Sequence, residues 1–329
     1  MERFDTARWT RRLALLLPAA VLAFAPLQAQ AKWPDKPVKI VLPFGAGGVA
    51  DVTSRILADR LEKKLGQRFV IENMPGPGGI NAARAVTTAP PDGYTMGLVT
   101  NGTAISVAAF NKLPFDPLKD FAMISGLGQF NLLFAVDANS KYKALGDFIA
   151  DAKANPGKLN IGSIVVGSTQ DLGAELFKSA AALNVSIVPF KNSPDVVVSL
   201  LRNDVQMVVD FPPALKGQIA AGKLRVLAST GPKREPDMPN VPTVAEAGIK
   251  GYEVTSWNGV FAPKDTPKDI LDAMGKAMHD ILNDGDVKAQ FAKVGVEAHA
   301  SSPQELTERM VVDIKKWNAV IDKAGIPRK

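Results

Sequence analysis

From residue 38 onward, short apolar runs alternate with segments in which apolar residues recur every three or four positions. The first set has an apolar run at residues 38–44, a helical pattern at 51–65 and a β-favouring run at 69–72. This alternation of strand and helix patterns predicts a βαβ unit. A further helical pattern at 80–88 and a strand-like stretch at 95–100 follow. We therefore expect three parallel strands whose carboxyl ends meet at one edge of a sheet.

A second block of the same kind begins after residue 134. Ser168, with Asp171 three positions later, matches the sequence pattern of a capping box. Ser193 before Pro194 predicts a helix start with a cap and a proline at its first position. These features predict a second α/β lobe. Its strand-like runs are 159–164, 185–190, 205–210 and 224–229, and its helical patterns are 168–183 and 196–201.

The last third of the chain has a different pattern. The proline-rich segment 231–252 leads into a strand-like stretch at 253–261, and the remainder has helical periodicity at 268–282, 286–294 and 303–324. The chain has no low-complexity segment and no solenoid repeat. The whole pattern predicts an α/β protein with two lobes and a helical C-terminal region.

The first 31 residues have the pattern of a secretory signal peptide. Four arginines precede an apolar run at 13–27, which contains two prolines and is shorter than the roughly 20 residues of a membrane span. An Ala-x-Ala site ends at Ala31, so we expect cleavage between Ala31 and Lys32 and export to the periplasm. Because Arg11-Arg12 also fits a twin-arginine signal, Sec and Tat export both stay open.

The composition of the chain argues against several kinds of partner and site. Hydrophobic residues make up 46% of the chain, enough for two cores, and the formal net charge of +6 is too mild to predict a nucleic-acid partner. With no cysteine, the protein has no disulfide, thiolate nucleophile or cysteine-bound metal. His279 and His299 are far apart and lack carboxylates at ligand spacing, so we expect no metal site.

The chain contains two glycine-rich turns of similar sequence, G-A-G-G at 45–48 and G-P-G-G at 76–79. Each lies between a strand-like and a helix-like stretch. Glycine lets the backbone approach a ligand closely, and a following helix directs unpaired N–H groups and its positive dipole end toward an anion. Residues 101–103 follow the third strand at the same sheet edge. This pattern predicts recognition of a small anion.

Four further stretches stand out along the chain. They are W-P-D-K-P-V-K-I-V-L-P-F-G-A-G-G-V-A-D from Trp33, G-P-G-G-I-N-A-A from Gly76, P-D-G-Y-T from Pro91 and V-P-T-V-A-E-A-G from Val241. In this order they resemble the Bug-type solute receptors of tripartite tricarboxylate transporters, and the resemblance runs from end to end of the chain. The resemblance implies an α/β, two-lobed periplasmic binding-protein fold of the Venus-flytrap, type II kind, with two hinge strands and a carboxylate in the cleft. Residues 32–130 plus 255–329 would form lobe 1, residues 131–254 lobe 2, and the crossings would fall near 128–134 and 253–261.

The resemblance also implies ligand contacts from both lobes. The first-lobe candidates are Phe44, Gly45, Ala46, Gly47, Gly48, Asp51, Gly78, Gly79, Thr100, Asn101 and Thr103. The second-lobe and hinge candidates are Ser163, Gly167, Ser168, Thr169, Asp210, Phe211 and Trp257.

Some of these candidates have a purely structural interpretation as well. Asp51 also fits a helix N-cap, Asp210 a polar strand end, and Trp257 hinge packing. The sequence departs from the family pattern at 164–166, which is apolar where glycine is common, and at Asp171, which stands where histidine is common. Asp171 would repel a second ligand carboxylate if it faced the cleft, so either it points into the capping box, as we expect, or the ligand is not a plain dicarboxylate.

The predicted activity is capture of a small carboxylate and its delivery to membrane transporter subunits, by a monomer without cofactor or catalytic residues. The ligand could be an aliphatic, aromatic or amino acid; Phe44 facing Phe211 would favour an aromatic or apolar spacer. A periplasmic sensor that reports to a kinase is an open alternative. A dinucleotide enzyme is another, because Gly45 to Ala50 fits G-x-G-x-x-A with Glu72 ending the next strand, but the signal peptide and the second glycine turn argue against it. The sequence contains no G-x-S-x-G nucleophile elbow of a hydrolase.

Overall fold

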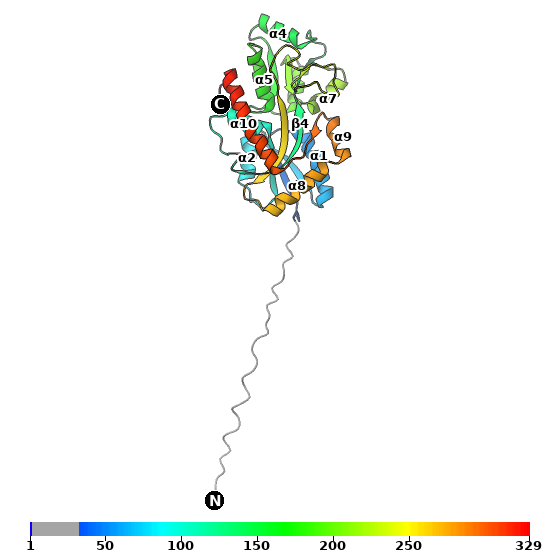
Figure 1. The fold of residues 1–329 in the computed structure, drawn as a ribbon. Helices are drawn as coiled ribbons and strands as arrows, with labels where there is room; N and C mark the ends of the chain where they lie inside the picture. The colour runs from blue at the N-terminus through cyan, green and yellow to red at the C-terminus, as the bar shows by residue number, and fades with distance from the viewer. Residues whose placement is uncertain (2–32) are drawn as a thin grey trace. The chain divides into compact units, whose positions relative to one another are not determined.

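The computed structural model describes Met1 and residues 33–329 (Figure 1). Apart from Met1, the predicted signal peptide and its cleavage point lie outside the described residues. In the described part of the chain, no helix combines the length and apolar character needed to cross a bilayer. Residues 33–329 form one compact unit.

Six strands form the first sheet, here called sheet A. They are β1 (Val38–Leu42), β2 (Phe69–Asn73), β3 (Thr95–Thr100), β4 (Phe121–Asn131), β10 (Thr255–Pro263) and β11 (Glu297–Ala298). Their spatial order is β11-β4-β10-β3-β1-β2. β1 pairs in parallel with β2 and β3, which confirms the three predicted parallel strands, whereas β10 pairs antiparallel with β3 and β4.

Helix α1 illustrates how local sequence produces these elements. Gly48, in an extended conformation, precedes it, and Gly66 ends it in the left-handed region at φ 77°, where its N–H donates to the Glu62 carbonyl at 2.9 Å. Leu57 and Leu61, one turn apart, are 0% exposed. Each buried leucine stabilises the fold by about 1.5–3 kcal/mol. The helices that surround sheet A are α1 (Val49–Leu65), α2 (Ile80–Thr87), α3 (Asn101–Ala109), α8 (Lys268–Leu282), α9 (Gly285–Lys293) and α10 (Pro303–Ala324).

Five strands form the second sheet, here called sheet B. They are β5 (Leu133–Asp137), β6 (Asn160–Ile164), β7 (Ser186–Phe190), β8 (Met207–Asp210) and β9 (Leu224–Ser229), in the spatial order β7-β6-β8-β5-β9. β6 pairs in parallel with β7 and β8, and β5 pairs antiparallel with β8 and β9. The accompanying helices are α4 (Leu145–Ala154), α5 (Thr169–Ala180), α6 (Ser193–Leu201) and α7 (Pro212–Ala220).

The chain passes between the sheets at two adjacent places. β4 ends at Asn131 and β5 begins at Leu133, and the return reaches β10 at Thr255. Thr230, which is fully buried, ties the two crossings together: its hydroxyl accepts from the Leu132 N–H at 2.9 Å and donates to the Val254 carbonyl at 2.6 Å. The lobe boundaries predicted at 130/131 and 254/255 lie beside these crossings and remain a proposal.

Several sequence expectations need correction. α3, α4, α7 and most of β4 were not predicted; residues 101–103, placed at the sheet edge by the sequence, are the start of α3. The cap of α6 is Asn192, whose side chain accepts from the Asp195 N–H at 2.9 Å, so the prediction of Ser193 as the cap was wrong by one residue. β11 interrupts the region predicted to be wholly helical, because Glu297 and Ala298 pair with the outer edge of β4.

Candidate functional site

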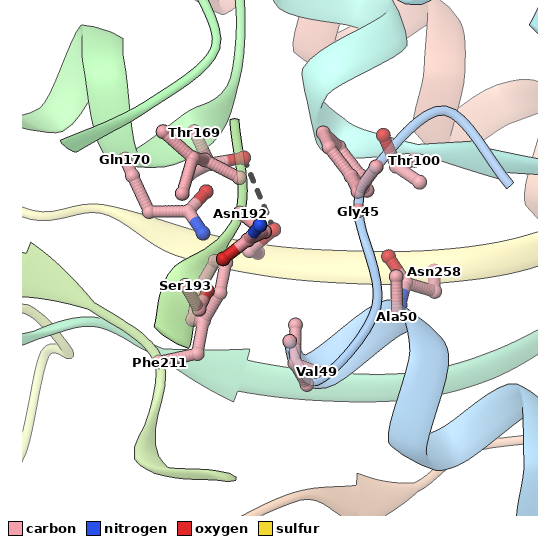
Figure 2. Close-up of a pocket in the computed structure, with 14 residues that line it drawn as sticks. Gly45, Val49, Ala50, Thr100, Thr169, Gln170, Asn192, Ser193, Phe211 and Asn258 are labelled. Carbon is pink, nitrogen blue, oxygen red and sulfur yellow. Dashed lines mark hydrogen bonds between the residues drawn. The ribbon is translucent and has the colours of Figure 1, made fainter. Parts of the chain in front are cut away.

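A small cavity lies between the parts of the chain built on the two sheets (Figure 2). Its volume is about 20 Å³, room for about one water molecule. Wall A, from the sheet-A side, consists of Phe44, Gly45, Gly48, Val49, Ala50, Thr100, Ser256 and Asn258. Wall B, from the sheet-B side, consists of Ile164, Thr169, Gln170, Asn192, Ser193 and Phe211.

Five helices begin at this cavity. Gly48, Thr100, Asn192 and Phe211 directly precede α1, α3, α6 and α7, and Thr169 is the first residue of α5. The first N–H groups of a helix have no partner within the helix, and each N-terminus carries roughly half a positive charge. Such an arrangement favours an anion in the cavity.

Helix α7 contributes less to anion binding than the other four. Its first two residues, Pro212 and Pro213, have no N–H group, and the N–H of Phe211 donates to Asp210 Oδ1 at 2.7 Å. The dipole of α7 still points at the cavity, but its backbone donors are missing or already paired. The N–H donors available to a ligand therefore come from α1, α3, α5 and α6.

The cavity is small because the two walls touch. The N–H of Gly78 donates to the Val166 carbonyl at 3.0 Å, and Asn101 Nδ2 donates to Thr169 Oγ1 at 3.1 Å. A Cβ atom added to Gly45 would lie 2.6 Å from the Cβ of Asn192. The structure is thus a closed form, in which glycine is needed where the backbones approach each other most closely.

The turns before α1 and α5 have the same construction. Gly47 and Gly167 both have φ of +85°, a conformation that favours glycine. The N–H of Gly47 donates to Asp51 Oδ2 at 3.0 Å, and the N–H of Gly167 donates to Asp171 Oδ2 at 3.0 Å. In each turn an aspartate in the first helical turn fixes the loop and takes up one backbone donor.

The electrostatic surroundings of these two aspartates differ. Burial raises the pKa of Asp51, but hydrogen bonds from Arg55, Gly47 and Asn73 outweigh this effect and hold its pKa below the ordinary value. The Arg55 guanidinium reaches Asp51 Oδ1 at 2.8 Å. For Asp171, burial is the largest effect and raises its pKa above the ordinary value. The hydrogen bond from the Gly167 N–H and the charge of Lys329, whose Nζ lies 3.9 Å from Asp171 Oδ2, lower the pKa but do not outweigh burial.

Both aspartates test capping predictions made from the sequence. Gly48, not Asp51, is the N-cap of α1, so the interpretation of Asp51 as the cap residue was wrong. Asp51 instead accepts the N–H of Gly47 from within the first turn. The prediction for Asp171 is confirmed only in part: its N–H donates to Ser168 Oγ at 3.1 Å, so Ser168 is the cap, but its carboxylate accepts from the Gly167 N–H, and the Ser168 N–H donates to the Val165 carbonyl instead.

Asp210 lies behind wall B and is fully buried. Its Oδ1 accepts from Gln170 Nε2 at 3.0 Å and from the Phe211 N–H, while its Oδ2 has no hydrogen-bond partner among the described residues. Burial raises the pKa of Asp210, and the Ser193 hydroxyl, Gln170 and the Phe211 N–H act in the opposite direction. Gln170, Ser193 and Phe211 all line the cavity, so Asp210 holds three residues of this wall from behind.

Two side chains of wall A are also unpaired. Thr100 Oγ1 and Asn258 Nδ2 have no hydrogen-bond partner within residues 33–329, although these residues are only 2% and 3% exposed. A hydroxyl and an amide NH₂ buried in this way are available as donors to a ligand.

The structure brings most of the predicted site residues to the walls or next to them. Phe44, Gly45, Gly48, Thr100, Thr169 and Phe211 line the cavity. Gly78, Gly79, Thr103, Gly167 and Ser168 line a neighbouring cavity of about 10 Å³ that shares Phe44 and Thr100 with the first. Ala46, Gly47, Asp51, Asn101, Ser163 and Asp210 are not among the lining residues of either cavity.

Trp257 lies elsewhere. Alternation along β10 places its neighbours Ser256 and Asn258 at the cavity and its own ring on the opposite face, where its indole N–H donates to Asp313 Oδ2 of α10 at 2.6 Å. It lines a separate cavity of about 220 Å³ together with residues of α10. The prediction that Trp257 walls the ligand is therefore corrected to a packing role between β10 and α10.

Sequence reasoning missed eight lining residues. Val49, Ala50 and Gln170 follow directly after predicted turns, so the helix starts themselves could have indicated them. Asn192 and Ser193 belong to a helix start that was recognised as structure but not as part of the site. The complete set is Val49, Ala50, Ile164, Gln170, Asn192, Ser193, Ser256 and Asn258. Within residues 33–329, no group of three or more His, Cys, Asp or Glu residues is arranged to hold a metal ion.

The chain is similar to known receptors over nearly its whole length. Residues 53–326 match the family described as tripartite tricarboxylate transporter family receptor. Protein BugT of Bordetella pertussis is 30% identical over 325 residues, which are 97% of this chain and 99% of BugT.

Solved structures show the same similarity. R. palustris Rpa4515 with adipate is 33% identical with a TM-score of 0.86, covering 90% of this chain and 99% of that one. The periplasmic binding protein BugD is 28% identical with a TM-score of 0.86, covering 90% and 100%. MatC from Rhodopseudomonas palustris with bound malate is 29% identical with a TM-score of 0.83, covering 88% and 100%.

Proposed function

This chain belongs to the tripartite tricarboxylate transporter receptor family, and from that premise we propose that it captures a small carboxylate between walls A and B and delivers it to a tripartite tricarboxylate-type membrane transporter. It has the two-lobed α/β fold of periplasmic binding proteins. The signal peptide predicted at residues 1–31 and the similarity to the periplasmic binding protein BugD support action in the periplasm.

The observation that carries the proposal is the convergence of five helix N-termini on one cavity. No lysine or arginine is among the residues that line this cavity within residues 33–329. Backbone N–H groups and dipoles would therefore supply the attraction for a carboxylate. Because no salt bridge would have to be broken for release, such a site suits a protein that hands its ligand on.

Closure would couple capture to delivery. A carboxylate that accepts hydrogen bonds from α1 or α3 on wall A, while its other end contacts wall B, binds the closed form more tightly than the open one. The two crossings joined by Thr230 are the natural place for the opening motion, because within residues 33–329 the backbone passes between the sheets only there. A membrane partner could then recognise the closed arrangement.

A thermal-shift and calorimetry screen of residues 32–329 tests this proposal. Carboxylates, including adipate and malate, would be compared with NAD and ATP. A ligand present at 100 times its dissociation constant adds about 2.7 kcal/mol of stability. Stabilisation by carboxylates alone is expected, whereas stabilisation by NAD alone would point to a nucleotide site and overturn the receptor function.

Delivery needs a second test in cells. Deletion of the gene should abolish uptake of the radiolabelled ligand, and the full chain with its leader should restore it. If uptake persists while a transcriptional response to the ligand is lost, the protein serves a sensor kinase instead of a transporter.

A further inference from the structure

A second cavity, here called the rear cavity, lies beside Trp257, whose ring is on the face of β10 opposite to walls A and B. Its volume is about 220 Å³, compared with about 20 Å³ for the cavity between the walls. An apolar cavity of about 150 Å³ is large enough to hold benzene. Folded proteins contain few voids larger than a water molecule, so the rear cavity indicates room for a small organic molecule.

The rear cavity is enclosed by β4, β10 and α10, which packs along β4 (Figure 1). Gln129 and Trp257 are paired directly across β4 and β10, so their side chains share one face of sheet A. Leu306 of α10, which is 2% exposed, also lines the cavity. Trp257 and Leu306 thus supply apolar surface, and the Gln129 amide supplies a polar group.

Arg309 supplies a positive charge to the rear cavity, and no other lysine or arginine in the described part of the chain lines it. The Arg309 Nε donates to Asp313 Oδ2 at 2.8 Å, and the same oxygen accepts from the Trp257 indole N–H at 2.6 Å. Among residues 33–329, Nη1 and Nη2 of Arg309 have no hydrogen-bond acceptor. A guanidinium held by its Nε can present both Nη groups to the two oxygens of a carboxylate.

The acidic residue that lines the rear cavity is already engaged. Glu305 Oε2 accepts from the Ser302 N–H at 2.7 Å and from the Ser302 hydroxyl at 2.9 Å, as part of the capping box of α10. Asp313, behind the cavity, balances the charge of Arg309. Directed hydrogen bonds from the Nη groups, more than net charge, would therefore hold an anion here.

We propose that the rear cavity is a second binding site, which takes a small aromatic monocarboxylate of the benzoate type. The carboxylate accepts from Nη1 and Nη2 of Arg309, and the ring lies against Trp257 and Leu306. An aromatic ring suits this place because it pairs with the indole ring and has no rotatable bonds to immobilise. Asn258 is the one residue that lines both this cavity and the cavity between the walls.

Fluorescence and calorimetry with benzoate, on residues 32–329, test this site. Trp317 is bonded to Asn101 beside the cleft, so the fluorescence experiment uses Trp317→Phe and follows Trp257. Trp33 also remains, but it lies against Tyr94 and outside the rear cavity. Benzoate should change the emission saturably, whereas benzyl alcohol, which has the ring without the carboxylate, should bind about tenfold or more weakly.

Arg309→Gln should weaken benzoate binding about tenfold or more, because the two Nη groups are lost. Arg234→Gln is the matched control: the Arg234 Nε donates to Glu246 at 2.8 Å, as that of Arg309 does to Asp313, but Arg234 does not line the cavity. Benzoate affinity should be unchanged in this control. If Arg309→Gln does not fold, Gln129→Phe should abolish benzoate binding by placing a ring in the cavity, with circular dichroism as the check on folding.

Thr100→Val, which alters wall A, separates the rear cavity from the cleft. Benzoate binding that persists in Thr100→Val and is weakened in Arg309→Gln supports the rear site. The opposite pattern would place benzoate in the cleft and overturn the rear site. Equal affinities for benzoate and benzyl alcohol, or no saturable change with benzoate, would overturn it as well. None of these three results would overturn the proposed receptor function, which the screen with adipate and malate tests separately.

Discussion

The backbone N–H of Gly78 donates to the carbonyl of Val166 at 3.0 Å, so the second glycine turn of the sheet-A side is bonded directly to the turn before α5. In the closed form this N–H is used for contact between the two sides and not for an anion. Gly45 and Asn192 make a comparable close approach. The glycines of these turns are therefore required for closure as well as for access to a ligand.

Gly45→Ala is expected to hinder closure. The new methyl group would lie 2.6 Å from Asn192 Cβ and 3.0 Å from the Lys191 carbonyl oxygen, distances too short for a Cβ atom. Affinity for the carboxylate should fall about tenfold or more, because the ligand can no longer be held by both walls. Calorimetry measures this loss. Gly146→Ala in α4, where nothing lies within 4 Å of the added atom, is the control; equal affinities in the two variants would show that closure is not needed for binding.

Asp51→Ala and Asp51→Asn should differ in their effects. The alanine variant loses both the Gly47 hydrogen bond and the Arg55 pair, whereas asparagine keeps an oxygen for Gly47. We expect the alanine variant to lose about 1–3 kcal/mol of unfolding free energy and the asparagine variant less. Carboxylate affinity should follow the same order, measured by urea unfolding and calorimetry. Similar losses in both variants would show that the ion pair with Arg55, and not the hydrogen bond from the Gly47 N–H, is the stabilising interaction of Asp51.

Much of the fold could be predicted because strand and helix periods depend on local sequence. The three parallel strands, α8 and α10 were predicted within a few residues. α3 was missed because its sequence, N-G-T-A-I-S-V-A-A, has no polar face; Ala104, Ile105 and Ala108 are all buried at 1% exposure or less. A helix buried on most sides shows no amphipathic period.

The site could be predicted only in part, for a related reason. The glycine turn 45–48 was recognisable because its residue types imply an unusual backbone next to a helix start. The partners of each donor were not recognisable, because they come from the opposite wall, as in the pair Gly78 and Val166. The orientation of Trp257 was missed because it depends on how β10 pairs with β4, including a register shift between Asn258 and Gly259.

The pH dependence of stability should change in Asp210→Asn. Burial raises the pKa of Asp210 in the folded protein above its ordinary value of 3.8, so the folded state holds this proton more tightly than the unfolded chain. The resulting stabilisation is complete below the unfolded pKa and is lost as pH rises through the folded pKa. The uncharged amide cannot lose a proton.

We therefore expect the melting temperature of Asp210→Asn, relative to wild type, to be higher at pH 7 than at pH 4 by about 2 °C or more. Differential scanning calorimetry from pH 4 to pH 8 measures this difference. The other acids near wall B, Asp171 and Asp195, are present in both proteins and cancel in the comparison. A difference that stays constant with pH would show that Asp210 has the same pKa in the folded and unfolded states.

Tryptophan fluorescence should report ligand binding through Trp317 rather than Trp257. The Trp317 indole N–H donates to Asn101 Oδ1 at 2.8 Å, and Asn101 donates in turn to Thr169 of wall B, so opening of the cleft breaks a chain that includes Trp317. Trp257 is bonded to Asp313 instead, away from the cavity. Ligand addition should change the emission of the wild type and of Trp257→Phe, but the change should be lost in Trp317→Phe, with circular dichroism as the check on folding. Loss of the signal in Trp257→Phe alone would instead place the moving contact at β10 and α10, and would assign the opening motion to the hinge strands themselves.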